Sequence, residues 1–274
     1  MKQSLTFQYL DDLAMAADKR GKNVTGYFSE LNDFPIGPFV EWLLLSRMDG
    51  AALPSLASFS VVPAVAQLLE ALGNNGRPVF FDGSNGSAGF IRITRDFEDV
   101  DHAGWVKFKM QMSTKAQIAF LAGVEARALV GALEEIENNV LEHSQRSHDA
   151  LVAFVAKPDE FSFVVGDNGI GPLSSFRSCS EYEYLADHGE ALRLTLADGA
   201  SRHGHTSGHG KGYNSLFIGL AMMQANLRFR AGNKMLSIRG VGPSRTADTI
   251  TDRTHLQGFL ASVVCRSPQG TLLQ

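Results

Sequence analysis

Cysteine, basic charge and long apolar runs are all scarce in this sequence, and each shortage excludes a class of protein. The two cysteines, Cys179 and Cys265, are too far apart in the chain for the paired spacing of a metal-binding motif. Their small number favours a reducing compartment. Lys and Arg (25) are outnumbered by Asp and Glu (29) and form no run, so we expect no nucleic-acid partner.

The apolar pattern does not indicate a membrane segment. The longest apolar patch, FVEWLLL at residues 39–45, contains a glutamate and is too short to cross a bilayer. The N-terminal stretch turns acidic at Asp11 and Asp12, which is unlike a secretory signal. We therefore expect a cytoplasmic protein without membrane association. A hydrophobic content of 44% in 274 residues supports a globular fold with a substantial core.

The first hundred residues predict a small α/β region whose role the sequence does not indicate. Apolar periodicity and the positions of prolines favour helices at about 8–19, 37–49 and 62–74. Two short runs rich in β-branched and aromatic residues, 78–83 and 90–95, favour strands on either side of a turn-rich segment.

The pattern changes at about residue 104. The segment WVKFKMQMS, residues 105–113, alternates between apolar and polar side chains and predicts a strand. A helical run follows from Thr114 to Ser144, in which Gly123 or Gly131 could mark a break between two helices.

The remaining segments predict an antiparallel sheet. Residues 150–156 and 161–165 favour two strands joined by a tight turn at 157–160. The rest of the chain is expected in this order: a loop-rich segment at 172–207, a helix at 213–226, a hairpin of strands at 227–231 and 234–238, and a final strand at 258–265. Strands joined by short turns, with helices grouped beside them, indicate an α+β sandwich: a mostly antiparallel sheet with helices on one face.

Within the helical run, ALEEIENNVLEHS at residues 132–144 places polar side chains at the border of an apolar stripe. Four aliphatic residues form the stripe: Leu129, Leu133, Ile136 and Val140. Glu135 and Asn139 lie about 90° from its centre, where both would be half buried. Glu134 and Asn138 point almost opposite, toward solvent. The alternative is an ordinary amphipathic helix with a polar edge.

A second feature is VVGDNGIGP, residues 164–172. Asp167 follows a buried strand directly, and Gly169 and Gly171 come behind it. A carboxylate at a strand end, followed by glycines that let a flat ligand approach the backbone, can accept a hydrogen bond from an exocyclic amine. The alternative is a plain Asn-Gly turn.

A third feature is SGHGKGYNSLFIGLAMM, residues 207–223. Glycines alternate at Gly208, Gly210 and Gly212 before a predicted helix, with Lys211 among them. Bare backbone N–H groups at a helix N-terminus form an anion site, so phosphate is the expected ligand. The spacing does not match a Walker A loop, and the absence of a preceding strand does not suit a dinucleotide-binding fingerprint. The alternative is a flexible glycine-rich segment with no ligand.

In this order, the three features resemble the GHKL superfamily, whose Bergerat-type ATP-binding domain occurs in gyrase, heat-shock chaperones, mismatch-repair ATPases, sensor histidine kinases and anti-sigma-factor serine kinases. EIENNVLEHS is similar to the N box, DNGIG to the first glycine box and GHGKG to the second. The resemblance covers about residues 104–266. It implies an ATP-binding domain at 104–274, a Bergerat-type α/β sandwich, beside an N-terminal α/β region at 1–103.

The resemblance also implies a role for each matching residue. Asn139 would be the ligand of Mg²⁺, an ion that prefers oxygen donors. Glu135 would be the general base near the γ-phosphate, and Asp167 would accept from the adenine amino group. The glycine boxes would bind the nucleotide, with Gly169 and Gly171 shaping the base pocket and the phosphates held by Gly208, Gly210, Lys211 and Gly212.

Several neighbouring features follow from the same resemblance. His143 matches the N box of the stand-alone anti-sigma type, but we expect a structural role for it. Residues 172–207 correspond to the ATP lid and are expected to contain a helix at about 181–201. Apart from the resemblance, three neighbouring imidazoles can bind zinc, but no fourth ligand of the right type lies near His203, His205 and His209.

Two functions are compatible with these observations. The first is a Mg²⁺-dependent ATPase or protein serine/threonine kinase that acts in regulation. Histidine autophosphorylation is not expected, because no paired helices with an acceptor histidine precede the N box. The alternative is a nucleotide-sensing module whose lid controls a protein partner without significant turnover. A homodimer is compatible with the resemblance, although no heptad pattern in the sequence indicates one.

Overall fold

The computed structural model describes a set of segments that together contain the strands of one sheet and the helices around it. These segments are residues 5–20, 35–47, 53, 77–83, 86–93, 102–143, 150–195, 225–239 and 249–267. Of residues 18–20, 132 and 135–143 only the backbone is described. The helix predicted at 62–74 lies outside the described residues.

The described strands form a single antiparallel sheet of six strands in the order β1-β2-β3-β4-β6-β5. Their bounds are β1 Val79–Gly83, β2 Gly86–Ile93, β3 Ala150–Lys157, β4 Glu160–Asp167, β5 Asn226–Arg239 and β6 Thr249–Arg266. The α+β class and the antiparallel sheet predicted from the sequence are therefore confirmed. The tight turn between β3 and β4 is also present, with Asp159 in the left-handed region at φ 61°.

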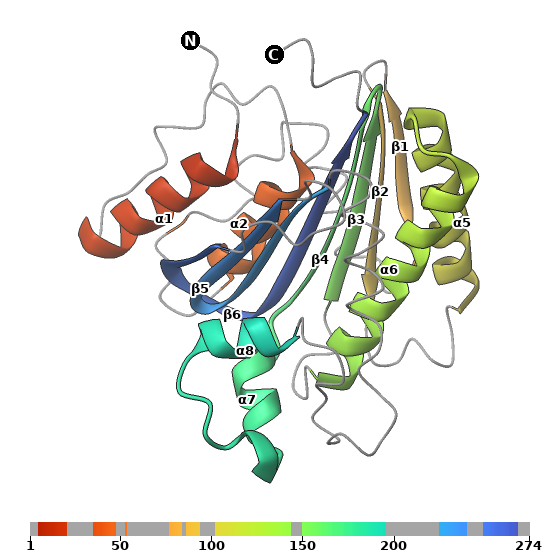
Figure 1. Cartoon of the computed structure of the whole chain (residues 1–274). Helices are drawn as coiled ribbons and strands as arrows, with labels where there is room; N and C mark the ends of the chain where they lie inside the picture. Colours follow the sequence, from red (N-terminus) through yellow and green to blue (C-terminus); the bar gives the residue numbers. More distant parts are fainter. Residues whose placement is uncertain are drawn as a thin grey trace.

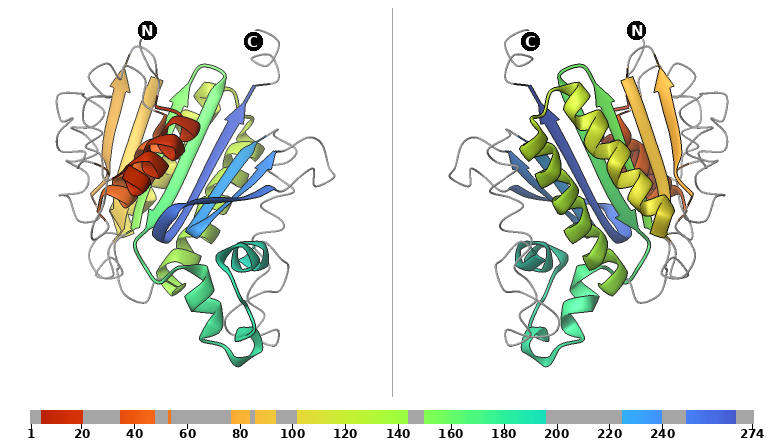
Figure 2. Two further views of the ribbon diagram at one scale, coloured as in Figure 1. Left: turned by 90° about the vertical axis from the view of Figure 1, so that its left-hand side faces the viewer. Right: turned by 90° about the vertical axis from the view of Figure 1, so that its right-hand side faces the viewer.

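Helices cover both faces of this sheet (Figures 1 and 2). The helices α5 (His102–Ala119) and α6 (Gly123–His143) lie on one face, as expected for residues 104–266. The helices α1 (Phe7–Arg20) and α2 (Ile36–Ser46) lie on the other, which the sequence did not predict. Three shorter elements lie beyond the end of β4: α7 (Gly171–Arg177), the 3-10 helix η3 (Ser180–Tyr182) and α8 (His188–Thr195).

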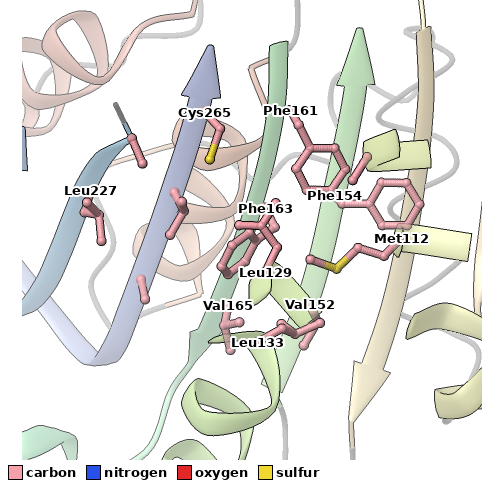
Figure 3. Packing of buried hydrophobic residues seen from close by; sticks show 14 of the residues in the cluster. Met112, Leu129, Leu133, Val152, Phe154, Phe161, Phe163, Val165, Leu227 and Cys265 are labelled. Atoms are coloured by element: carbon pink, nitrogen blue, oxygen red, sulfur yellow. The ribbon is translucent and has the colours of Figure 1, made fainter. Parts of the chain in front are cut away.

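The central strands are buried on both faces, which explains their continuous apolar runs. Val152 and Phe154 of β3 face α5 and α6, whereas Leu151 and Ala153 face α1 and α2. Figure 3 shows the α5 and α6 side, where Phe154 and other side chains of the sheet pack together with residues of the two helices.

One predicted strand is wrong. Residues 105–113 belong to α5, in which Trp105, Phe108, Met112 and Ala116 are buried. Their spacing of three and four residues forms a helical stripe, whereas Met110, which the alternating pattern counted as inward, is 66% exposed. The break between α5 and α6 falls at residues 120–122, just before Gly123, and the Glu125 carboxylate accepts the Ala122 N–H there.

The predicted hairpin at 227–231 and 234–238 is also wrong, because both halves belong to the continuous strand β5. Both halves pair with β6, which is 18 residues long and therefore extends along the whole of β5. The irregularity falls at Gly232, where φ is 52° and the register shifts on either side. Of the helix predicted at 213–226, only the last two residues are described, and Asn226 already begins β5.

A buried ionic network joins α1 and α2 to β5 and β6. The Arg228 guanidinium donates to Asp11 of α1 at 2.7 Å and to Glu41 of α2 at 2.9 Å. Arg230 donates to Glu41 at 2.7 Å, and Arg253 donates to Asp11 at 2.7 Å. The N-terminal segments therefore share a sheet and a network with later residues, while the domain boundary at residue 103 stays a prediction.

Glu41 is fully buried, so its charge depends on the two arginines. Burial raises the pKa of this carboxyl, but the charges of Arg228 and Arg230 lower it and prevail, so it is held below its usual value. A lowered pKa in the folded state stabilises the protein above the unfolded pKa, and that contribution is lost as pH falls through the folded pKa.

Among the described helices, none has the length and apolar character that crossing a membrane requires.

We predict that Glu41→Gln lowers the free energy of unfolding by about 3–5 kcal/mol, because it leaves buried guanidinium groups without a compensating charge. Glu160→Gln is the matched control, since Glu160 pairs with the half-exposed Arg266 and should cost less than about 1 kcal/mol. Urea denaturation at pH 7 measures both. Equal effects of the two substitutions would contradict a structural role for the network.

Candidate functional site

The candidate site centres on Asp167, the last residue of β4. This strand lies between β3 and β6, and Asp167 pairs with Ala150 on one side and Phe259 on the other. The alternation of side chains along β4 places Asp167 on the same face as Phe163 and Val165, the face that α5 and α6 cover, and Asp167 is only 3% exposed. The sequence predicted its place at the end of a buried strand.

Backbone groups, rather than charged side chains, hold the Asp167 carboxylate. Its Oδ1 accepts the Gly169 N–H at 2.6 Å, and the carboxylate also accepts the Phe259 N–H. Burial raises the pKa of Asp167 to about 7, and the two backbone donors partly oppose that rise. Strongly shifted pKa values cluster at functional sites, and this one makes Asp167 a candidate.

The turn after Asp167 also carries a second polar acceptor. The side-chain oxygen of Asn168 is buried and has no hydrogen-bond partner among the described residues. Gly169 is buried and supplies the donor described above, and Gly171 begins α7 with φ 73°. Asp167, Gly169 and Gly171, which the sequence grouped into one box, therefore lie together in one turn between β4 and α7.

Gly258 of β6 contributes to the site, although the sequence analysis did not select it. Its φ is 83°, and a Cβ at this position would overlap the carbonyl oxygen of Asp167. The sequence did contain a signal for it: Gly258 begins the strand predicted at 258–265, and a glycine within a strand often marks a bulge or a close approach of two backbones.

The helix α6 places Glu135 and Asn139 in its C-terminal half. This helix contacts both β4 and α7, the two elements that flank the Asp167 turn. Its C-terminal end lies at the end of the sheet where β4 ends and α7 begins (Figures 1 and 2). The side chains of Glu135, Asn139 and His143 lie outside the described residues, so their roles as general base, Mg²⁺ ligand and structural residue stay predictions.

The second glycine box lies outside the described residues, and with it the phosphate-binding roles predicted for Gly208, Gly210, Lys211 and Gly212. The same holds for His203, His205 and His209. Within the part of the chain that the structure describes, no group of three or more His, Cys, Asp or Glu residues is placed to hold a metal ion.

Residues 171–195, which contain the first part of the lid predicted at 172–207, fold around a small core of their own. That core consists of Leu173, Phe176, Tyr182, Leu185 and Ala191. The helix predicted at 181–201 is described only as far as residue 195, and this part holds the end of η3 and then α8 instead of one continuous helix. Asp187 explains where α8 begins, because its carboxylate accepts the N–H groups of Gly189 and Glu190. His188 then packs against Gly232, which docks α8 on β5.

Comparison with protein-family models and with curated proteins finds no match to this chain.

We predict that Asp167→Asn stabilises the protein without ligand at pH 8. A carboxyl whose pKa is raised on folding destabilises the folded state as pH rises from the unfolded pKa toward about 7. The substitution removes this cost, which is on the order of 4 kcal/mol. Denaturation at pH 8 and at pH 4.5 measures it, and the gain should shrink at the lower pH.

Asp187→Asn is the control, because Asp187 is an exposed cap and asparagine caps helices equally well. Its stability should stay within about 0.5 kcal/mol of the wild type at pH 8. A destabilised Asp167→Asn at pH 8 would show that the ionised carboxylate stabilises the empty protein.

Proposed function

We propose that this protein binds ATP with Mg²⁺ in a GHKL-type site, in which the Asp167 carboxylate accepts a hydrogen bond from the adenine amino group. The observation that carries the proposal is the buried Asp167 carboxylate, held by two backbone donors at the end of β4 in a turn of glycines. An ionised carboxylate offers about four lone-pair sites, so two backbone bonds leave acceptor capacity for a ligand.

The position of α6 supports the rest of the proposed site. The helix with the N-box pattern contacts β4 and α7, next to the turn that would hold the base. Asn139 would then coordinate Mg²⁺ through its amide oxygen, and Glu135 would activate a water or an acceptor hydroxyl at the γ-phosphate. Backbone donors at Gly208, Gly210 and Gly212, with Lys211, would bind the phosphates. The reaction class is that of an ATPase or a protein serine/threonine kinase acting in regulation.

A second candidate function is a nucleotide sensor that controls a protein partner with little turnover. The folded state of residues 171–195 favours it, because this segment has its own core and docks on β5 through α8. A segment that begins at the base-binding turn and ends on another strand can report ligand occupancy as a change in docking. Such a readout requires ATP to have different affinities for the docked and undocked states.

We predict that the wild type binds Mg-ATP in isothermal titration and that Asp167→Asn weakens this binding at least tenfold, because a hydrogen bond to a charged acceptor is lost. GTP should bind more weakly than ATP, since the same position of guanine carries an oxygen acceptor. A wild type that ignores Mg-ATP would overturn the proposed function.

Phosphate release separates the two candidates. In the enzyme, Glu135→Gln retains Mg-ATP binding but loses phosphate release or transfer. Glu134→Gln is the matched control on the same helix, because Glu134 pairs with Lys109 instead of lining the proposed site. If the wild type and both variants bind ATP equally and none of them releases phosphate, the sensor is supported.

Binding should also depend on pH. Because the ionised form of Asp167 accepts from the amine, affinity for adenine should fall about tenfold per pH unit below about 7 and level off above it. Adenosine is the suitable probe, since it has no phosphate to titrate. A flat profile between pH 5.5 and 8.5 would contradict acceptance by the ionised carboxylate.

A further inference from the structure

The strand β6 changes its surroundings at Gly258. Before this residue β6 pairs only with β5, whereas from Phe259 onward it pairs with β4, and residues 260–264 pair with β5 as well. The change coincides with continuous burial, since Gln257 is exposed whereas every residue from Gly258 to Val263 is buried. Gly258 is therefore the point at which the continuously buried part of β6 begins, directly beside the end of β4.

Three backbone segments meet at Gly258 without side chains between them. A Cβ on Gly258 would overlap the Asp167 carbonyl oxygen and lie 2.9 Å from the Cα of Asn168. A Cβ on Gly171 would lie 2.9 Å from the carbonyl oxygen of Gly258. Both glycines have positive φ, 83° and 73°, which other residues adopt only with strain. The amide of Gln257 adds a hydrogen bond of 3.4 Å to the Asn168 carbonyl.

We propose that Gly258 is a positioning residue of the nucleotide site: its bare Cα lets β6 lie against the Asp167–Asn168 backbone, which aims the Phe259 N–H at the Asp167 carboxylate. The inference rests on the proposed function for its consequence in binding, but not for the contact itself. It also explains why residue 171 is a glycine, because a side chain at this position of the first glycine box would collide with the β6 backbone.

The pKa of Asp167 depends on how closely β6 lies against the Asp167–Asn168 backbone at Gly258. Burial raises the pKa of its carboxyl, and hydrogen bonds from the Gly169 N–H and the Phe259 N–H lower it. No charged side chain among the described residues contributes to the shift. Moving β6 outward lengthens the Phe259 bond, and the loss of a donor to the charged form raises the pKa of Asp167. Adenine would then meet a protonated carboxyl over a wider pH range.

The test is Gly258→Ala, with adenosine affinity measured from pH 6 to pH 9. We expect about tenfold weaker binding at pH 7 and recovery toward the wild type at pH 9, because a hydrogen bond to a charged group is lost and the carboxyl still ionises at higher pH. Gly86→Ala is the matched control: Gly86 also has positive φ (143°) and a crowded backbone, but it lies at the start of β2. Its profile should equal that of the wild type.

Gln257→Ala keeps the inference testable if Gly258→Ala does not fold. Gln257 is exposed and holds the same contact by one long hydrogen bond, so a smaller shift in the same direction is expected. Loss of affinity that is equal at every pH would overturn the positioning role and leave only a structural one.

A measurement without nucleotide separates this inference from the proposed function. Difference infrared spectra against Asp167→Asn follow the ionisation of Asp167 directly. An upward shift of its titration midpoint in Gly258→Ala or Gln257→Ala supports the positioning role even if adenosine does not bind. An unchanged midpoint in the folded variants overturns it, whereas failure of the wild type to bind adenosine or ATP counts against the proposed function alone.

Discussion

The burial of β4 on both faces is the constraint on which the other features depend. A strand covered by α5 and α6 on one side and by α2 on the other must be apolar throughout, and any polar group at its end becomes buried as well. Asp167 is such a group. It lies on the α5 and α6 face with Phe163 and Val165, and burial on that face raises its pKa. The α2 layer covers the neighbouring residue Gly166, where a Cβ would meet Leu44 and Val40.

The same constraint explains the ionic network at β5. The side of the sheet that faces α1 and α2 includes two arginines, Arg228 and Arg230, which could not be buried without partners. Glu41 and Asp11 supply those partners from two different helices, so the network fixes where both helices lie on the sheet. Replacing such a network with apolar side chains is often neutral for stability, so its contribution here is better described as orientation.

Local patterns were sufficient wherever the deciding contacts are local. The runs of β3 and β4 and the place of Asp167 at a strand end could be predicted, because a few adjacent residues determine them. The continuity of β5 could not be predicted, since it depends on pairing with the long strand β6. The Arg228–Glu41 pair joins residues 187 apart, and the approach of Gly258 to Asp167 likewise joins distant segments. The strand prediction for residues 105–113 was wrong for another reason: a segment of nine residues can match both the strand period of two and the helix period of 3.6.

Under the proposed function, stability and ligand binding are opposed at Asp167. A carboxyl that ionises only near pH 7 weakens the empty protein at neutral pH, and an asparagine could make similar backbone contacts without that cost. A bound amine would offset part of the cost, since its N–H stabilises the ionised form. Binding would then strengthen the turn between β4 and α7, and through α8 the contact with β5. A nucleotide at this turn would thus affect the strand farthest along the sheet on that side.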